Sequence, residues 1–160
     1  MSIRHAVMAD LDRLAEIEAV GYPAAEGASK ESIRGRLSVY PDYFWVLERD
    51  GKICAFVNGF VTNQADLTDE MYDDPKMHDP EGEWQMIFSV VTAPESQHSG
   101  CASELLRQVT ADAKAVGRKG VVLTCKDRLI GFYAQFGFVD EGISGSTHGD
   151  VVWHQMRLTY

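Results

Sequence analysis

The segment Gln97-His98-Ser99-Gly100-Cys101-Ala102 has the residue types and the position of an anion-binding loop. It lies between a run typical of a buried strand and a run with the spacing of an amphipathic helix. In that position, backbone N–H groups and the positive end of the helix dipole point to one place, which suits a pyrophosphate. Gly100 has no Cβ, so the backbone can approach a ligand closely. A glycine at a strand-to-helix joint is also common for structural reasons alone, and the local pattern leaves both interpretations open.

Other phosphate motifs and metal motifs are missing from the sequence. It contains neither G-x-x-x-x-G-K-[ST] nor a G-x-G-x-x-G that follows a strand. The histidines lack H-E-x-x-H or another short ligand spacing, so we expect no intrinsic metal. They are His5, His78, His98, His148 and His154.

Hydrophobic periodicity predicts the elements that position the loop. We expect helices from Asp10 to Gly21, from Ser29 or Ser32 to Pro41, from about Gly100 to Val116, and from Leu129 to Phe136. We expect strands at Ile3–Val7, Phe44–Glu48, Ile53–Val61, Trp84–Val91, Val121–Leu123, Phe138–Glu141 and Val151–Leu158. The order predicts a mixed α/β (α+β) sheet with helices on both faces.

Three local features refine this prediction. Asp50-Gly51 is a strong hairpin signal. The stretch from Asn63 to Glu83 has eight acidic residues, one lysine and no periodic pattern, so we expect a surface loop. The strands at Trp84 and Val121 should be parallel if the helix between them is a crossover. Apolar positions expected on the buried helix stripes include Val20, Val39 and Val116.

The length and composition fit one compact domain covering residues 1–160. The N-terminus lacks the apolar stretch of a signal peptide, and no run is long enough to cross a bilayer. Cys54, Cys101 and Cys125 form no C-x-x-C pair and suit a reducing compartment. We therefore expect a cytoplasmic protein without a membrane partner.

The formal net charge of -9 argues against sequence-independent nucleic-acid binding, which depends on Lys and Arg contacts to phosphates. It favours a cationic partner or substrate. A role in solubility alone is equally compatible with the charge.

Two motifs occur in the chain, Gln97-x-x-Gly100-x-Ala102 preceded by Pro94, and Phe132-Tyr133-x-x-Phe136-Gly137-Phe138. The first resembles the acetyl-CoA signature of the Gcn5-related N-acetyltransferases, and the second resembles the second signature of that family. The resemblance covers nearly the whole chain. It implies the acyl-CoA N-acyltransferase fold, a mostly antiparallel sheet whose central parallel strands, here Trp84 to Thr92 and Val121 to Cys125, splay apart.

The resemblance also implies how acetyl-CoA is held, as a co-substrate and without a metal. Backbone groups of Val90, Val91 and Thr92 would hold the pantetheine and help to polarise the thioester carbonyl. The loop residues Gln97, His98, Ser99, Gly100, Cys101, Ala102 and Ser103 would wrap the pyrophosphate. The signature lacks the Arg or Lys that family members often have, which leaves Arg107, Lys126 or Arg128 as outer partners.

The implied reaction is direct attack of an amine on the thioester in a ternary complex. Tyr133 matches the family's acid tyrosine and would protonate the leaving thiolate, because a phenol with a pKa of about 10 stays protonated at pH 7. The alternative is a packing role among Phe132, Phe136 and Phe138. Cys101 and Cys125 have no histidine at motif distance, so we interpret both as small packing residues.

The general base is where the sequence departs from a closer resemblance. Leu123-Thr124-Cys125-Lys126-Asp127 before Phe132-Tyr133 is similar to a stretch of the arylalkylamine (serotonin) N-acetyltransferases. Their relay histidines are replaced here by Met86 and Phe88. Glu83 is our first choice of base, acting through water, with His78 and His148 as alternatives; Glu83 is equally compatible with an exposed loop carboxylate.

Our leading hypothesis for the acceptor is the primary amine of a small molecule, attracted by the acidic stretch Asp66 to Glu83. The stretch is equally compatible with a solvated loop. Acetylation of a protein or peptide amine is a rival within the same chemistry. A non-catalytic acyl-CoA-binding module is the alternative from another class, because the histidine pair is missing. The sequence does not reveal the oligomeric state, and a homodimer is compatible with it.

Overall fold

The computed structural model describes all residues from Met1 to Tyr160. Its helices are α1 Leu11–Gly21, α2 Lys30–Val39, α3 Asp69–Asp73, α4 Cys101–Ala115 and α5 Ile130–Ala134. Its strands are β1 Ser2–His5, β2 Phe44–Arg49, β3 Lys52–Asn58, β4 Val61–Thr62, β5 Trp84–Met86, β6 Ser89–Thr92, β7 Gly120–Cys125, β8 Val139–Ile143 and β9 His154–Thr159. None of the helices combines the length and the apolar character needed to cross a bilayer.

The internal contacts divide the chain into two compact units. The first comprises Met1–Gly59 and Ser89–Val109, and the second comprises Phe60–Phe88 and Thr110–Tyr160. Each unit contains its own sheet, so we describe them in turn. A single domain covering residues 1–160 stays a prediction.

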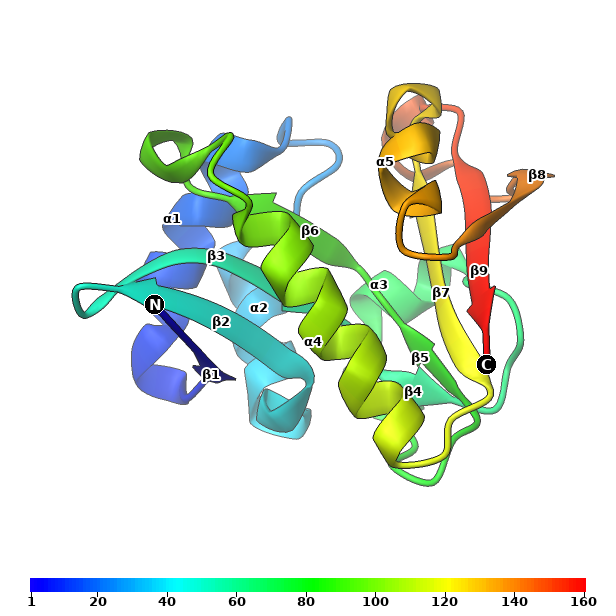
Figure 1. Cartoon of the computed structure of the whole chain (residues 1–160), viewed down its shortest axis with the longest axis horizontal. Helices are drawn as coiled ribbons and strands as arrows, with labels where there is room; N and C mark the ends of the chain where they lie inside the picture. Colours follow the sequence, from blue (N-terminus) through cyan, green and yellow to red (C-terminus); the bar gives the residue numbers. More distant parts are fainter. The chain divides into compact units, whose positions relative to one another are not determined.

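The sheet of the first unit is entirely antiparallel, in the order β1-β2-β3-β6. The predicted Asp50-Gly51 hairpin is present, with φ angles of 52° and 77° that suit a tight primed turn. Helices α1 and α2 lie on one face of this sheet and the first half of α4 on the other (Figure 1). Fully buried side chains from both layers form the core, including Leu14, Ile17, Ile33, Phe44, Phe56 and Leu105.

The sheet of the second unit is mixed, in the order β4-β5-β7-β9-β8. Strands β5 and β7 are parallel, as predicted, and the other pairs are antiparallel. Val121 and Val122 of β7 are fully buried, as expected for a central strand covered on both faces.

Three predictions about the elements were wrong. The run from Trp84 to Val91 is not one strand: β5 ends at Met86 and β6 begins at Ser89, in a different sheet. The loop-like stretch contains α3, whose Met71 is fully buried. Val20, Val39 and Val116 are 62%, 45% and 67% exposed, because each lies at a helix end where the apolar stripe turns out of the core.

Gly120 marks a close approach of two backbones in the second sheet. A Cβ at this position would lie 1.9 Å from the backbone oxygen of Leu158 in β9. Gly131 lies in α5, and a Cβ there would meet nothing within 4 Å. It therefore offers a matched control.

We expect Gly120→Ala to destabilise the protein by roughly 1–3 kcal/mol or more, because β7 or β9 must shift to admit the methyl group. Gly131→Ala should be neutral or slightly stabilising. Urea unfolding followed by circular dichroism measures both. Equal midpoints for the two variants would contradict the close approach.

Candidate functional site

The segment 97–100 forms an exposed turn between β6 and α4, as the sequence predicted. His98 and Gly100 have φ angles of 62° and 81°, so two residues of the turn are in the left-handed region. Left-handed residues of this kind are typical of turns whose successive N–H groups bind anions. No backbone oxygen accepts the N–H groups of residues 98–103, whereas Glu104 N–H already donates to Gly100 O at 3.1 Å. The turn therefore has donors available for an anion.

Space and anchoring in the turn come from two residues. A Cβ on Gly100 would meet nothing within 4 Å, so the backbone is open on that side. Cys101 is 1% exposed, and its thiol contacts the backbone oxygen of Ser96 at 3.8 Å. Cys101 thus packs beneath the turn, while Gln97, His98 and Ser99 are exposed above it and Ala102 and Ser103 begin α4.

Arg49 at the end of β2 brings a cation to the turn. Its Nη1 donates to Ser99 Oγ at 3.2 Å, and its Nη2 donates to Ser99 O at 3.4 Å. The sequence analysis missed this residue, because it lies 50 positions earlier and belongs to no motif. A basic side chain that the signature itself lacks is therefore present at the turn, contributed by β2.

The open edge of β6 presents the backbone groups of alternate residues. Ala93 N–H donates to Cys54 O at 2.7 Å, and the antiparallel register alternates from there. Val91 therefore turns its N–H and C=O toward Phe56 of β3, while Val90 and Thr92 turn theirs away from β3. The register corrects the expectation for Val91, whose backbone groups are already used within the sheet.

A second open edge lies at the carboxyl end of β7. Its parallel partner β5 pairs only as far as Met86 with Val122, and Ile87 N–H then donates to Val122 O at 2.9 Å. Leu123 and Cys125 bond to β9, so Thr124 turns its backbone groups to the side that β5 has left. The Thr124 side chain hydrogen bonds to the Tyr72 hydroxyl, with 3.0 Å between the two oxygens.

Tyr133 lies in α5, beside this end of β7. Its side chain is 6% exposed and packs edge-on against Phe132 and Phe138 at centroid distances of 5.1 and 6.1 Å. Burial raises the pKa of Tyr133 above its ordinary value, and the nearby Cys125 and Tyr72 raise it further. No protein group accepts its hydroxyl hydrogen, so Tyr133 is a protonated phenol able to donate to a ligand.

Cys125 is unsuited to nucleophilic catalysis. Burial, followed by the charges of Asp140 and Asp127, raises the pKa of its thiol to about 11. At neutral pH the thiol stays protonated, and the thiolate is the reactive form. All three cysteines are free and buried, which agrees with packing roles.

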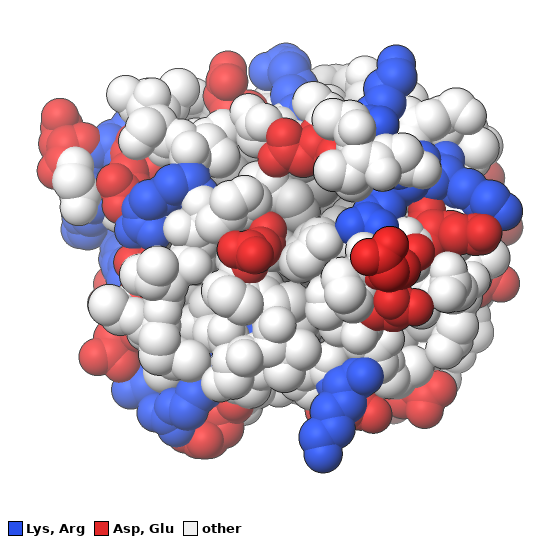
Figure 2. Space-filling model, turned by 90° about the horizontal axis from the view of Figure 1, so that it is seen from below, with Lys and Arg blue, Asp and Glu red and all other residues white.

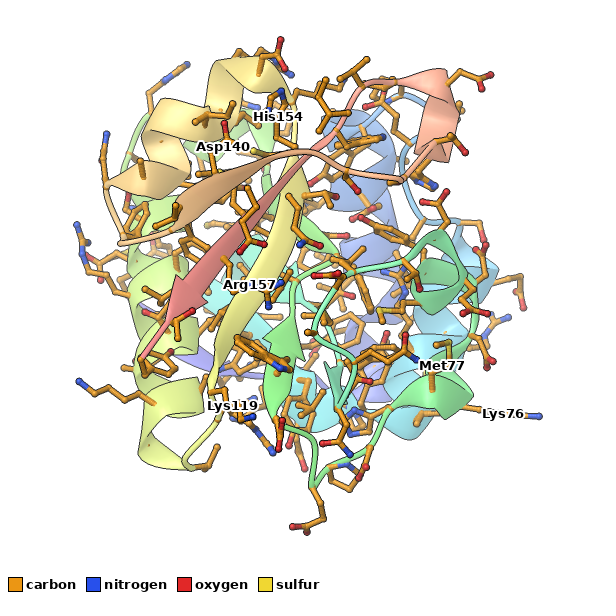
Figure 3. The ribbon with its side chains drawn as sticks, turned by 90° about the vertical axis from the view of Figure 1, so that its right-hand side faces the viewer. Lys76, Met77, Lys119, Asp140, His154 and Arg157 are labelled. Atoms are coloured by element: carbon orange, nitrogen blue, oxygen red, sulfur yellow. The ribbon has the colours of Figure 1, made fainter.

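Glu83 lies far from Tyr133 within the second unit. Its carboxylate pairs with Lys119 Nζ at 2.9 Å and is 48% exposed. Lys119 directly precedes β7, and Cys125, which neighbours Tyr133, is the last residue of that strand. The two are six residues apart, at about 3.3 Å per residue. In Figure 3, Lys119 lies at one end of the sheet, and His154, the partner of Cys125, lies at the other. This separation argues against Glu83 as the base.

The two alternative bases occupy different positions. His78 is half-buried, and its Nδ1 accepts a hydrogen bond from Val61 N–H at 3.1 Å. His148 stacks on Tyr72, with ring centroids 4.8 Å apart and an interplanar angle of 6°. Tyr72 in turn neighbours Tyr133, so the ring of His148 is linked to the predicted acid through one side chain. No group of three or more His, Cys, Asp or Glu side chains could hold a metal ion.

The first unit thus offers an amide-rich turn and the edge of β6, and the second offers the edge of β7 and a protonated phenol, on an α/β fold. The acetyltransferase (GNAT) family model matches residues 11–138. The chain therefore belongs to the GNAT family of acetyltransferases.

Solved structures support the same fold along the whole chain. The GphF GNAT-like decarboxylase in complex with isobutyryl-CoA is 23% identical with a TM-score of 0.84, covering 99% of both chains. The loading GNATL domain of CurA from Lyngbya majuscula is 18% identical with a TM-score of 0.86, covering 99% of this chain and 96% of that one. The PaiA N-acetyltransferase from Thermoplasma acidophilum in complex with coenzyme A is 18% identical with a TM-score of 0.72, covering 99% and 98%. A search of curated proteins finds no match.

The geometry around His78 generates a prediction about pH. Burial lowers the pKa of His78, and the charge of Arg118 lowers it further. Below the ordinary histidine pKa of about 6.5, His78 therefore takes up a proton when the protein unfolds. The stability that comes from keeping His78 neutral is therefore lost as the pH falls toward 5. We expect His78→Asn to show a smaller drop in urea midpoint between pH 7 and pH 5 than the wild type.

The exposed His5 provides the control, since His5→Asn should keep the wild-type pH dependence. An unchanged drop in His78→Asn would show that the neutral ring is not required by the fold.

Proposed function

We propose that the protein is an acyl-CoA-dependent N-acyltransferase that transfers acetyl from acetyl-CoA to an amine in a ternary complex. The observation that carries the proposal is the turn 97–103, whose amides lack backbone acceptors beside an open strand edge. Neighbouring structures bound to coenzyme A and isobutyryl-CoA support the choice of ligand. A small-molecule amine in the cytoplasm remains our preferred acceptor, and a protein or peptide amine is the rival.

The coenzyme would be bound at two of its parts, the pyrophosphate and the pantetheine arm. The pyrophosphate accepts from the amides of the turn and from the Arg49 guanidinium, which already lies on Ser99. The pantetheine pairs with the outward backbone groups of Val90 and Thr92, in the manner of an added strand. The residues Gln97, His98, Gly100, Cys101, Ala102 and Ser103 shape the turn that carries these donors.

Tyr133 would protonate the coenzyme A thiolate as the amine nitrogen bonds to the acetyl carbon and the C–S bond breaks. Its phenol is buried, protonated and without a protein acceptor, so its hydrogen is available to the leaving sulfur. The amine must lose a proton before or during attack. His148 stacked on Tyr72 is better placed for this step than Glu83, which is engaged by Lys119.

The resemblance to arylalkylamine N-acetyltransferases bears only on which amine is the acceptor. It rests on the stretch Leu123–Asp127 before Tyr133, while Met86 and Phe88 replace the relay histidines. The match to the GNAT family model does not identify this subgroup, so an aromatic amine is one of the acceptors to be assayed.

A second candidate is decarboxylation of an acyl-CoA that carries a carboxylate. The apolar Met86 and Phe88 at the expected relay positions favour it, because loss of CO2 needs no base for an amine. The GNAT-like decarboxylase among the similar structures provides a precedent for this chemistry on the fold.

Calorimetry with acetyl-CoA, followed by assays of free thiol across amines and peptides, tests the proposal. Binding with amine-dependent thiol release supports the transferase. Binding with CO2 release from a carboxylated acyl-CoA supports the second candidate, and binding without turnover supports a regulatory module. Absence of binding would remove all three.

We expect Tyr133→Phe to lower kcat by about 10²-fold while leaving the Kd of acetyl-CoA unchanged, because only proton donation to the thiolate is lost. Steady-state thiol release and calorimetry measure the two quantities. An unchanged kcat would exclude Tyr133 as the acid, and a Kd that rises in parallel would indicate a packing role.

We expect Arg49→Ala to weaken binding of 3′,5′-ADP by about 10-fold, because a charge-assisted contact to phosphate is lost. Arg34→Ala is the control, since Arg34 pairs with the exposed Glu31 within α2. Equal affinities in the two variants would show that Arg49 only fixes the turn.

A further inference from the structure

Tyr22, the first residue after α1, bonds to the open edge of β6. Its hydroxyl donates to Val90 O at 3.0 Å and accepts from Val90 N–H at 3.1 Å. Both outward groups of Val90 therefore end on one phenol oxygen. A side chain occupies the place that the next strand of the sheet would take.

The loop that carries Tyr22 is fixed to the same strand. Glu18 in α1 is 2% exposed, and its carboxylate accepts from Ala28 N–H at 2.9 Å and from Ser89 Oγ at 3.2 Å. Gly27 lies against Tyr22, since a Cβ there would lie 3.0 Å from Tyr22 Cβ. Residues 22–28 thus hold the phenol in place through a few specific contacts.

This arrangement conflicts with an occupied coenzyme site. The pantetheine arm has two amides, which pair with a strand edge as a peptide does. The N–H and C=O groups of Val90 cannot hydrogen bond to the Tyr22 phenol and to a pantetheine amide at the same time. Val90 is held by its neighbours in the β3–β6 ladder, whereas Tyr22 is half-buried in a connection, so Tyr22 is the group that can move.

We propose that Tyr22 is a placeholder at the pantetheine subsite, and that acyl-CoA binds by displacing its hydroxyl from Val90. This inference rests on the proposed function. The phenol satisfies the backbone of the ligand-free protein, where an unpaired N–H and C=O would be unfavourable. The same hydrogen bonds oppose the ligand, so the affinity for acyl-CoA is lower than the open edge alone would give.

Tyr22→Phe tests the proposal, because it removes the hydroxyl and keeps the ring. Two neutral hydrogen bonds no longer compete, so the Kd of acetyl-CoA should fall by about 10-fold. The Kd of 3′,5′-ADP should not change, because this fragment has no pantetheine arm. Tyr160→Phe is the matched control: it also removes a phenol hydrogen bond, to Thr110 O, and should alter neither affinity.

An acetyl-CoA affinity that is unchanged or weaker in Tyr22→Phe would overturn the placeholder. If the wild type binds neither acetyl-CoA nor 3′,5′-ADP, the proposed function itself fails, which is a different result. If Tyr22→Phe unfolds, hydrogen exchange of the wild type decides. The amides of Glu26, Gly27 and Ala28 should exchange faster with acetyl-CoA and not with 3′,5′-ADP, and slower exchange would refute the displacement.

Discussion

The change of hydrogen-bond partner within the run Trp84–Thr92 is the constraint on which the rest of the structure depends. The first part of the run, β5, pairs with β7, and the second part, β6, pairs with β3 in another sheet. This change leaves the outward backbone groups of Val90 and Thr92 on β6 without a strand neighbour. It leaves those of Thr124 on β7 without one as well. Since such groups are costly to bury unpaired, they must bond to side chains, water or a ligand.

The chemistry proposed here follows from that constraint. At Val90 the Tyr22 hydroxyl satisfies the groups, and at Thr124 the threonine side chain is held by Tyr72 beside the buried Tyr133. The amides of the turn 97–103 add donors directly after β6. A coenzyme with a diphosphate, two amides and a thioester supplies acceptors and donors for sites of these kinds.

The sequence predicts the local parts of this arrangement well. Features that depend on neighbouring residues or on one crossover could be predicted from sequence patterns. They are Gly100 with its turn, the Asp50-Gly51 hairpin and the parallel pair β5–β7. The break at Ile87–Phe88 could not be predicted, because a hydrophobic run indicates that a strand is buried but does not indicate which strand it pairs with. Tyr22 and Arg49 were missed for a related reason: their contacts with Val90 and Ser99 span 68 and 50 positions, and neither belongs to a motif.

The acidic stretch shows how composition can mislead about a binding partner. Much of its charge serves the local fold: Asp74 and Asp79 accept from the amides of Lys76 and Glu81 at 3.1 and 2.9 Å, and Asp69 accepts from Thr147 N–H at 3.0 Å. Arg157 pairs with Asp66 at 2.7 Å while stacking on Trp84, and it also bonds to Glu141.

The charges elsewhere support the same argument. On the face shown in Figure 2, acidic and basic side chains are interspersed around uncharged surface. Exposed pairs of this kind contribute little net field beyond the Debye length of about 8 Å in physiological salt. The formal charge of -9 is therefore weak support for attraction of a cationic amine. In the proposed reaction, recognition of the acceptor would depend more on groups close to the predicted acid Tyr133, such as the rings of Tyr72 and His148.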